Sequence, residues 1–176
     1  PVEISQVVVD DFGKGGNISW GRVDRCMTCH VSVDKPGFED VARTLKLSVV
    51  KDEAALADLI KQKPEMKNWA VTEKEKKKLQ TMYGTHPRTQ ELLAKHPVEQ
   101  FGCTTCHGGD GRGLIIKGKA FGHEDKAHAF HHHAVEPLLR GPQMESNCLA
   151  CHMGQIEVSG AKNLTKGLEL FVQLGC

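Results

Sequence analysis

The clearest alternation of hydrophobic and polar positions lies in the middle of the first half of the chain. Apolar residues recur at spacings of three and four across 52–60, and acidic residues come early in this stretch, which predicts an amphipathic helix. A second helix is predicted to begin at Thr72, because Thr72 and Glu75 have the spacing of a capping box. This helix is expected to run to Tyr83 and to stop at Gly84.

Elsewhere the pattern is weaker. Residues 87–95 fit a third, short helix, and residues 165–174 predict a last one with three apolar side chains on a shared face. The valines at 7–9 indicate a strand, which the glycine-rich stretch 13–16 would end in a turn. Because strand signals are otherwise scarce, we expect a mainly α fold with extensive loops and little β structure.

Composition limits what such a fold can bury. The chain has 176 residues, of which 39% are hydrophobic but only 5% aromatic, so it offers thin material for a purely protein core. A net charge of +1 gives no electrostatic attraction to nucleic acid, and no apolar run is long enough for a membrane helix. We expect a single domain over 1–176, with sub-parts 1–100 and 101–176. Since the chain opens on Pro1 without a Met, we interpret it as a processed product or a fragment.

Cysteine and histidine are the unusual residues, with seven and ten copies. Six cysteines form three pairs of identical spacing, each followed at once by His: segments 26–30, 103–107 and 148–152. This C-x-x-C-H pattern is that of covalent c-type haem attachment. Two thiols three positions apart on a helical turn can reach the two vinyl groups of a porphyrin, and the adjacent imidazole can bind the iron. The predicted haem-binding residues are Cys26, Cys29, His30, Cys103, Cys106, His107, Cys148, Cys151 and His152.

Three other interpretations of the cysteines compete with haem. A C-x-x-C pair is also half of a zinc site, a thioredoxin-like redox pair or part of a disulfide framework. None of these requires His after the second Cys, and three such histidines would arise by chance with a probability of roughly 2 in 10,000 from this composition. Zinc sites also favour pairs that are closer together than the 73 residues between Cys29 and Cys103. We therefore predict three haem c groups.

The seventh cysteine, Cys176, is the last residue of the sequence. Our hypothesis is that it begins a fourth C-x-x-C-H motif and would carry a fourth haem. The alternative is an unpaired terminal cysteine, which is unusual in an oxidising compartment.

Each iron also needs a ligand on its distal side, or it stays open for chemistry. His86 and His96 each precede a proline, which stiffens the backbone beside the imidazole. Because His96 precedes Cys103 by only seven residues, it would bind the iron of a neighbouring haem rather than that of its own motif. From the cluster at 127–133 we favour His133, with His128 in reserve, although a His triplet also suits a surface metal-binding tract.

Three segments carry a resemblance to a known family. Residues 23–30, 96–109 and 167–176, with their Val-Asp-Arg-Cys-x-x-Cys-His and Gly-Cys-x-x-Cys-His patterns, resemble bacterial multihaem c-type cytochromes. The most similar are periplasmic ones that accompany respiratory quinol-oxidising or anaerobic electron-transfer complexes. The resemblance covers residues 20–30 and 83–176.

This resemblance implies a core built around stacked haems. It also implies that His86, His96 and one histidine of 128–133 are distal ligands, and that an anchor helix precedes Pro1. The expected partners are other redox proteins or subunits of a membrane electron-transfer complex, with no nucleic acid; assembly of copies into an oligomer stays open.

We therefore expect an electron carrier rather than an enzyme. At least three bis-His haems would relay electrons between respiratory partners, and each potential would be set by ligation, burial and hydrogen bonding. Because c-type haem is attached outside the cytoplasm, we expect a periplasmic or outward-facing location. The alternatives are a multihaem oxidoreductase with one open haem that acts on a small nitrogen or sulfur compound, and a structural subunit with zinc in the Cys/His sites.

Overall fold

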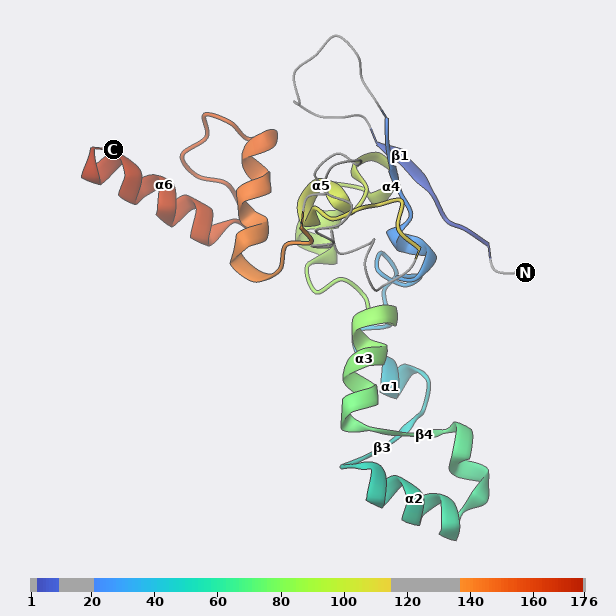
Figure 1. Ribbon diagram of the computed structural model, residues 1–176. Helices are drawn as coiled ribbons and strands as arrows, with labels where there is room; N and C mark the ends of the chain where they lie inside the picture. The colour runs from blue at the N-terminus through green and yellow to red at the C-terminus, as the bar shows by residue number, and fades with distance from the viewer. Residues whose placement is uncertain (1–2, 10–20, 115–136, 176) are drawn as a thin grey trace, which may run out of the picture. The chain divides into compact units, whose positions relative to one another are not determined.

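The computed structural model describes residues 3–9, 21–114 and 137–175 (Figure 1). About 49% of the described residues are helical, and the strands are few and three residues long. The expectation of a mainly α chain with little β structure is therefore confirmed. In the described part of the chain, no helix is long and apolar enough to span a membrane.

The chain divides into two compact units. Unit 1 comprises residues 1–28 and 91–176, and unit 2 comprises residues 29–90. The division thus falls at residues 28 and 90, whereas the sub-parts expected from the sequence meet at residue 100. Unit 2 is an insertion between the two pieces of unit 1.

Unit 2 contains a two-stranded parallel sheet with short helices around it. The strands β3 (Ser48–Val50) and β4 (Ala70–Thr72) pair with Ser48 opposite Ala70. Such a parallel pair needs a crossover connection between its strands, and here two helices supply it. The helices of the unit are α1 (Val41–Thr44), α2 (Glu53–Gln62), η2 (Pro64–Asn68) and α3 (Glu73–Tyr83). The element η3 (Thr89–Leu93) crosses the boundary between the two units in the sequence.

The two main helices of unit 2 begin where the sequence predicts. Asp52 caps α2 by accepting a hydrogen bond from the Ala55 N–H at 3.0 Å. At the start of α3, the Thr72 hydroxyl accepts from the Glu75 N–H at 3.2 Å, while the Glu75 carboxylate accepts from the Thr72 N–H at 2.8 Å. Both halves of the predicted capping box are formed, and α3 ends at Gly84 as expected.

The helix expected over 87–95 is wrong in extent. Only η3 forms there, as a single five-residue π-helical turn. Prolines at 87 and 97 bound this segment, and the residue before a proline is disfavoured in helical conformation, so little room remains for a regular helix.

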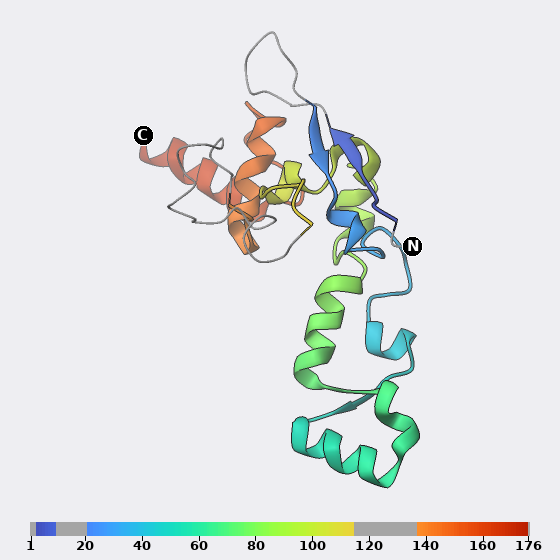
Figure 2. The same cartoon turned by 45° about the vertical axis from the view of Figure 1, so that its right-hand side comes forward.

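Unit 1 contains a short antiparallel pair with helical turns beside it (Figure 2). The strand β1 (Val7–Val9) pairs with β2 (Arg22–Asp24), with Val7 opposite Asp24, which confirms the strand predicted at 7–9. The glycine-rich stretch 13–16 lies outside the described residues. The helical elements are η1 (Cys26–Thr28), α4 (Val98–Phe101), α5 (Thr104–His107), η4 (Gly141–Ala150) and α6 (Lys162–Leu174).

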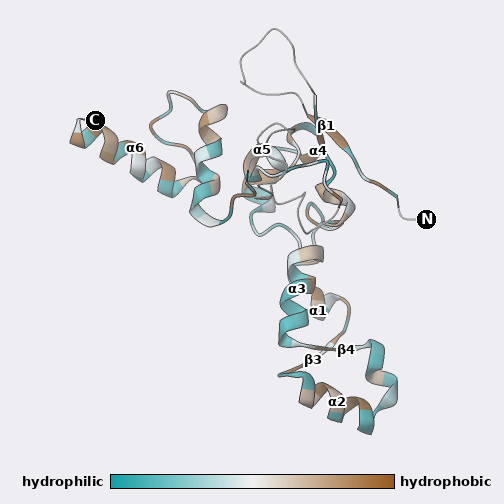
Figure 3. Ribbon diagram, viewed as in Figure 1, coloured by the Kyte–Doolittle hydropathy of each residue, from teal (hydrophilic) through white to brown (hydrophobic). Residues whose placement is uncertain are grey.

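The last helix, α6, is anchored by its first turn. The Glu145 carboxylate accepts hydrogen bonds from the Leu164 N–H at 2.9 Å and the Asn163 side-chain amide at 2.8 Å. α6 starts three residues before the predicted 165–174 and ends at Leu174. Hydrophobic residues lie along it (Figure 3), and Phe171 and Leu174 on the predicted apolar face are 58% and 74% exposed.

The buried core is built from small apolar side chains only. Every buried apolar side chain among the described residues is a valine or an alanine: Val9, Val41, Ala42, Ala70, Val98, Val158 and Ala161. No Leu, Ile, Phe, Met or Trp in the described part of the chain reaches that level of burial, and Trp69 is 56% exposed. As the composition indicates, the polypeptide supplies little large apolar surface to its own core.

Candidate functional site

All three C-x-x-C-H segments begin in a helical turn. Cys26 opens η1, Cys103 is the N-cap of α5, and Cys148 lies in the last turn of η4. In the second motif the His107 N–H donates to the Cys103 carbonyl at 2.9 Å, and in the third the His152 N–H donates to the Cys148 carbonyl at 2.8 Å. The first cysteine and the histidine of both motifs are thus one helical turn apart.

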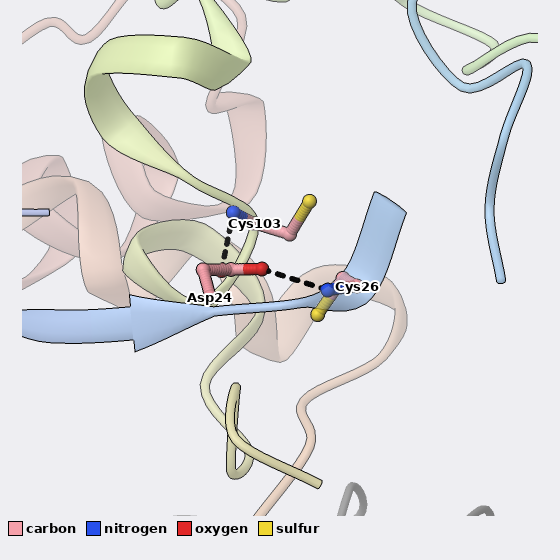
Figure 4. Close-up of side chains that lie close together, drawn as sticks. All are labelled: Asp24, Cys26 and Cys103. Atoms are coloured by element: carbon pink, nitrogen blue, oxygen red, sulfur yellow. Dashed lines mark hydrogen bonds between the residues drawn. The ribbon is translucent and has the colours of Figure 1, made fainter. Parts of the chain in front are cut away.

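A buried carboxylate links the first and second motifs. Asp24 is 3% exposed and ends β2, two residues before Cys26. Its Oδ1 accepts a hydrogen bond from the Cys26 N–H at 3.0 Å, and its Oδ2 accepts one from the Cys103 N–H at 2.7 Å (Figure 4). The same Oδ2 also accepts from the Thr104 N–H at 2.7 Å. A single side chain therefore holds the first cysteines of two motifs that are far apart in the sequence.

The electrostatics of Asp24 follow from these contacts. Burial on its own would raise the pKa of Asp24, but hydrogen bonds from Thr104, Cys26 and Cys103 outweigh burial and lower that pKa below its ordinary value. The group is consequently a carboxylate at neutral pH, and its negative charge lies beside two of the motif thiols.

Glycine is required next to this carboxylate. Gly102 has a φ of +61°, and a Cβ there would lie 2.9 Å from the Asp24 Oδ2 and 2.8 Å from the Val9 Cγ2. The Gly-Cys pair that opens the second motif therefore has a physical reason: only a residue without a side chain lets the backbone approach Asp24 this closely.

The Cys26 and Cys103 thiols also interact with each other. A hydrogen bond to the Cys103 thiol, burial and the nearby Asp24 carboxylate all raise the pKa of Cys26 well above the usual thiol range.

The second and third motifs are neighbours as well. The Asn147 side chain, one residue before Cys148, donates to the Cys106 carbonyl at 2.8 Å, and the Leu139 N–H donates to the His107 carbonyl at 2.7 Å. Burial, followed by the proximity of the Cys148, Cys103 and Cys151 thiols, raises the pKa of Cys106. The four cysteines of these two motifs accordingly lie in one region of unit 1.

The hydrogen bonds of the histidines distinguish the candidate ligands. The Nδ1 of His96 lies 3.1 Å from the Leu92 carbonyl oxygen, and the Nδ1 of His152 lies 3.2 Å from the Gln155 Oε1. Because these oxygens only accept, each Nδ1 carries the proton, which leaves a lone pair on Nε2. In His86 the Nδ1 instead accepts from the Arg88 N–H at 3.2 Å, so the proton of the neutral ring is on Nε2.

The residues around Asp24 suit a structural zinc site less well than they suit haem attachment. Asp24, Cys26 and Cys103 place three ligand atoms within 4.8 Å of one another, a grouping found among the described residues. A structural zinc site needs four ligands, and both oxygens of Asp24 are already bound to N–H donors. This grouping offers three ligand atoms, one fewer than a structural zinc site needs.

The predicted haem-binding residues are divided between the two units. Cys29, His30 and His86 belong to unit 2, whereas the second and third motifs and His96 belong to unit 1. His128, His133 and Cys176 lie outside the described residues. Sequence reasoning missed Asp24 and Asn147, although a carboxylate two residues before a motif cysteine could have indicated a local N–H acceptor.

Comparison of the chain with protein-family models, curated proteins and solved structures finds no match.

Proposed function

We propose that this chain is an electron-transfer protein that carries three covalent c-type haems and relays electrons between respiratory redox partners. The haems are attached at segments 26–30, 103–107 and 148–152, and the protein works in the periplasm or on an outward-facing surface. A fourth haem at Cys176 and an anchor beyond the chain remain part of this proposal. When bound, each haem supplies a reversible one-electron iron couple.

The observation that carries the proposal is that Cys26 of the first motif, the second motif and the third motif lie close together within unit 1. Asp24 binds the first cysteines of motifs one and two, and Asn147 joins motif three to Cys106 of motif two. Porphyrins attached at such neighbouring points would have edges close together, which an electron relay requires. The chain's own contribution is to fix these attachment points and to set the environment of each iron.

Two further features support haem over the alternatives. In motifs two and three a helical-turn hydrogen bond joins the histidine to the first cysteine, which suits attachment at a porphyrin edge. The restriction of the buried core to valine and alanine leaves large apolar burial to another group, and a porphyrin would provide it.

One observation favours a second candidate function. The hydrogen bond to the Nδ1 of His86 puts the ring proton on Nε2, the atom that would otherwise bind iron. If the haem that His86 was expected to serve has no distal ligand, its iron is open. The protein would then be an oxidoreductase that acts on a small nitrogen or sulfur compound at that haem.

The proposal is tested on the full chain, produced with periplasmic c-type haem maturation. The expected results are an intact mass with three covalent haems, one for each complete motif of the sequence, and sharp low-spin bands after reduction. The matched variant C148A/C151A should carry two haems. A chain purified with zinc and without haem absorption would overturn the proposal, whereas a haem that binds carbon monoxide in the unsubstituted protein would favour the oxidoreductase.

A further inference from the structure

We propose that His96 and His152 are the two axial ligands of one iron, that of the haem attached at Cys148 and Cys151. This inference rests on the proposed function, because it requires haem at the third motif. It assigns the distal ligand of one haem, and it takes that ligand from the segment that leads into a different motif.

The spacing of the two rings supports the pairing. The ring centroids of His96 and His152 are 6.1 Å apart. An iron between two imidazoles, each bonded through nitrogen at about 2 Å, separates the ring centroids by about 6 Å. The interplanar angle of 75° is also compatible, because each axial ring can take any rotation about its bond to the iron.

The hydrogen bonds of both rings support the same assignment. In each ring the Nδ1 donates to an oxygen, the Leu92 carbonyl for His96 and the Gln155 side chain for His152. Histidine ligands of metals characteristically donate their second ring nitrogen to such an acceptor, which fixes the tautomer and the ring orientation. Both residues therefore have the Nε2 lone pair that an iron needs.

His96 is also held in place by its surroundings. Its backbone N–H donates to the Leu92 carbonyl at 2.9 Å, and its ring packs edge-on against Phe101 with centroids 5.2 Å apart. Pro97 follows as the N-cap of α4, which fixes the chain just beyond the ligand. The protein's own contacts therefore fix the position and orientation of the ring.

The consequence for the relay is a direct link between two haems. His96 binds the third haem while Cys103, seven residues later, holds the second one. Only the short helix α4 lies between them in the sequence, so the ligand of one haem and the attachment point of the next belong to one short segment.

The decisive experiment compares His96→Ala in two backgrounds of the haem-loaded full chain. In the otherwise unsubstituted protein, H96A should raise the number of carbon monoxide-binding haems by one per chain. In the C148A/C151A background, which lacks the third haem, H96A should leave the number of carbon monoxide-binding haems unchanged. An increase of one in both backgrounds would assign His96 to another haem, and no increase in either would show that it is not a ligand; both outcomes overturn the inference.

A second variant covers the case in which H96A does not fold. His96→Met should keep the haem count and convert one low-spin haem from His/His to His/Met ligation, seen by near-infrared magnetic circular dichroism. Persistence of His/His signals alone would overturn the pairing. If the unsubstituted chain carries no haem, the proposed function itself fails, which separates the two failures.

Discussion

Replacing Asp24 by asparagine should strongly destabilise unit 1. The side chain keeps its size but loses its charge, and one of its two oxygens becomes an N–H₂ donor. Because Oδ2 accepts from both Cys103 and Thr104, the asparagine oxygen would take that position. The new side-chain NH₂ group would then face the Cys26 N–H, and because both groups are donors, no hydrogen bond could form between them.

The magnitude follows from the three hydrogen bonds. A hydrogen bond to a charged group contributes about 1.5–3 kcal/mol and one between neutral groups about 1 kcal/mol, while a buried donor left unpaired costs about 1–3 kcal/mol. Losing the Cys26 bond and weakening the other two should lower the free energy of unfolding by about 2–4 kcal/mol. Asp24→Ala leaves all three N–H groups without this acceptor and should cost more.

The assay is urea unfolding of the purified full chain, followed by circular dichroism at neutral and acidic pH. Because the pKa of Asp24 is lowered in the folded protein, its carboxylate stabilises the fold above the ordinary value of 3.8. That contribution is lost as the pH falls from there through the lower, folded-state pKa. The difference between the parent and D24N should therefore shrink at acidic pH.

The matched control is Asp58→Asn, which makes the same chemical change at an exposed position. Asp58 forms a 3.5 Å surface pair with Lys61, so D58N should change the free energy of unfolding by less than about 0.5 kcal/mol. If D24N at neutral pH behaved like D58N, the assignment of Asp24 as the link between the first two motifs would be refuted.

Three other substitutions, one of them paired with a control, test single features. Gly102→Ala should lower the free energy of unfolding by about 1–3 kcal/mol, because Gly102 has a positive φ and a Cβ there would contact Asp24 and Val9. Its control is Gly167→Ala, at a helical position with open space around it, which should raise the free energy of unfolding by about 0.5–1 kcal/mol. Thermal melts compare the two variants. Thr72→Ala removes half of a capping box and should cost about 1 kcal/mol, seen as faster hydrogen exchange in α3 and contradicted by unchanged exchange. Asn147→Ala removes the bond to the Cys106 carbonyl and should cost about 1 kcal/mol in urea unfolding, with an unchanged midpoint as the contrary result.

Local signals made the helices of unit 2 predictable. Asp52 and Thr72 cap their helices through side-chain contacts within three residues, and such contacts are visible in the sequence. The pairing of β3 with β4 was not predicted. Each strand is three residues long, and their parallel register depends on the intervening helices rather than on any pattern inside the strands.

The candidate site also has features that local sequence signals predict and features that they do not. The C-x-x-C-H spacing is local and could be recognised directly, and its helical turns follow from that spacing. The roles of Asp24 and Asn147 could not be predicted, because their partners lie 79 and 41 residues away in the sequence. The pairing of His96 with His152 likewise depends on how distant segments pack, which hydrophobic periodicity does not encode.

The contact of Asp24 with Cys103 closes a loop, and this has a consequence for how the chain tolerates change in length. Unit 2, the 62 residues from 29 to 90, is contained in that loop. The entropy of closing a flexible loop rises only logarithmically with its length, by about 0.6 kcal/mol per doubling. Insertions that leave the helices and strands of unit 2 intact, away from Cys29, His30 and His86, should therefore leave the closure almost unaffected. We expect related chains to vary most in length here while they keep the aspartate and the glycine that seal the loop.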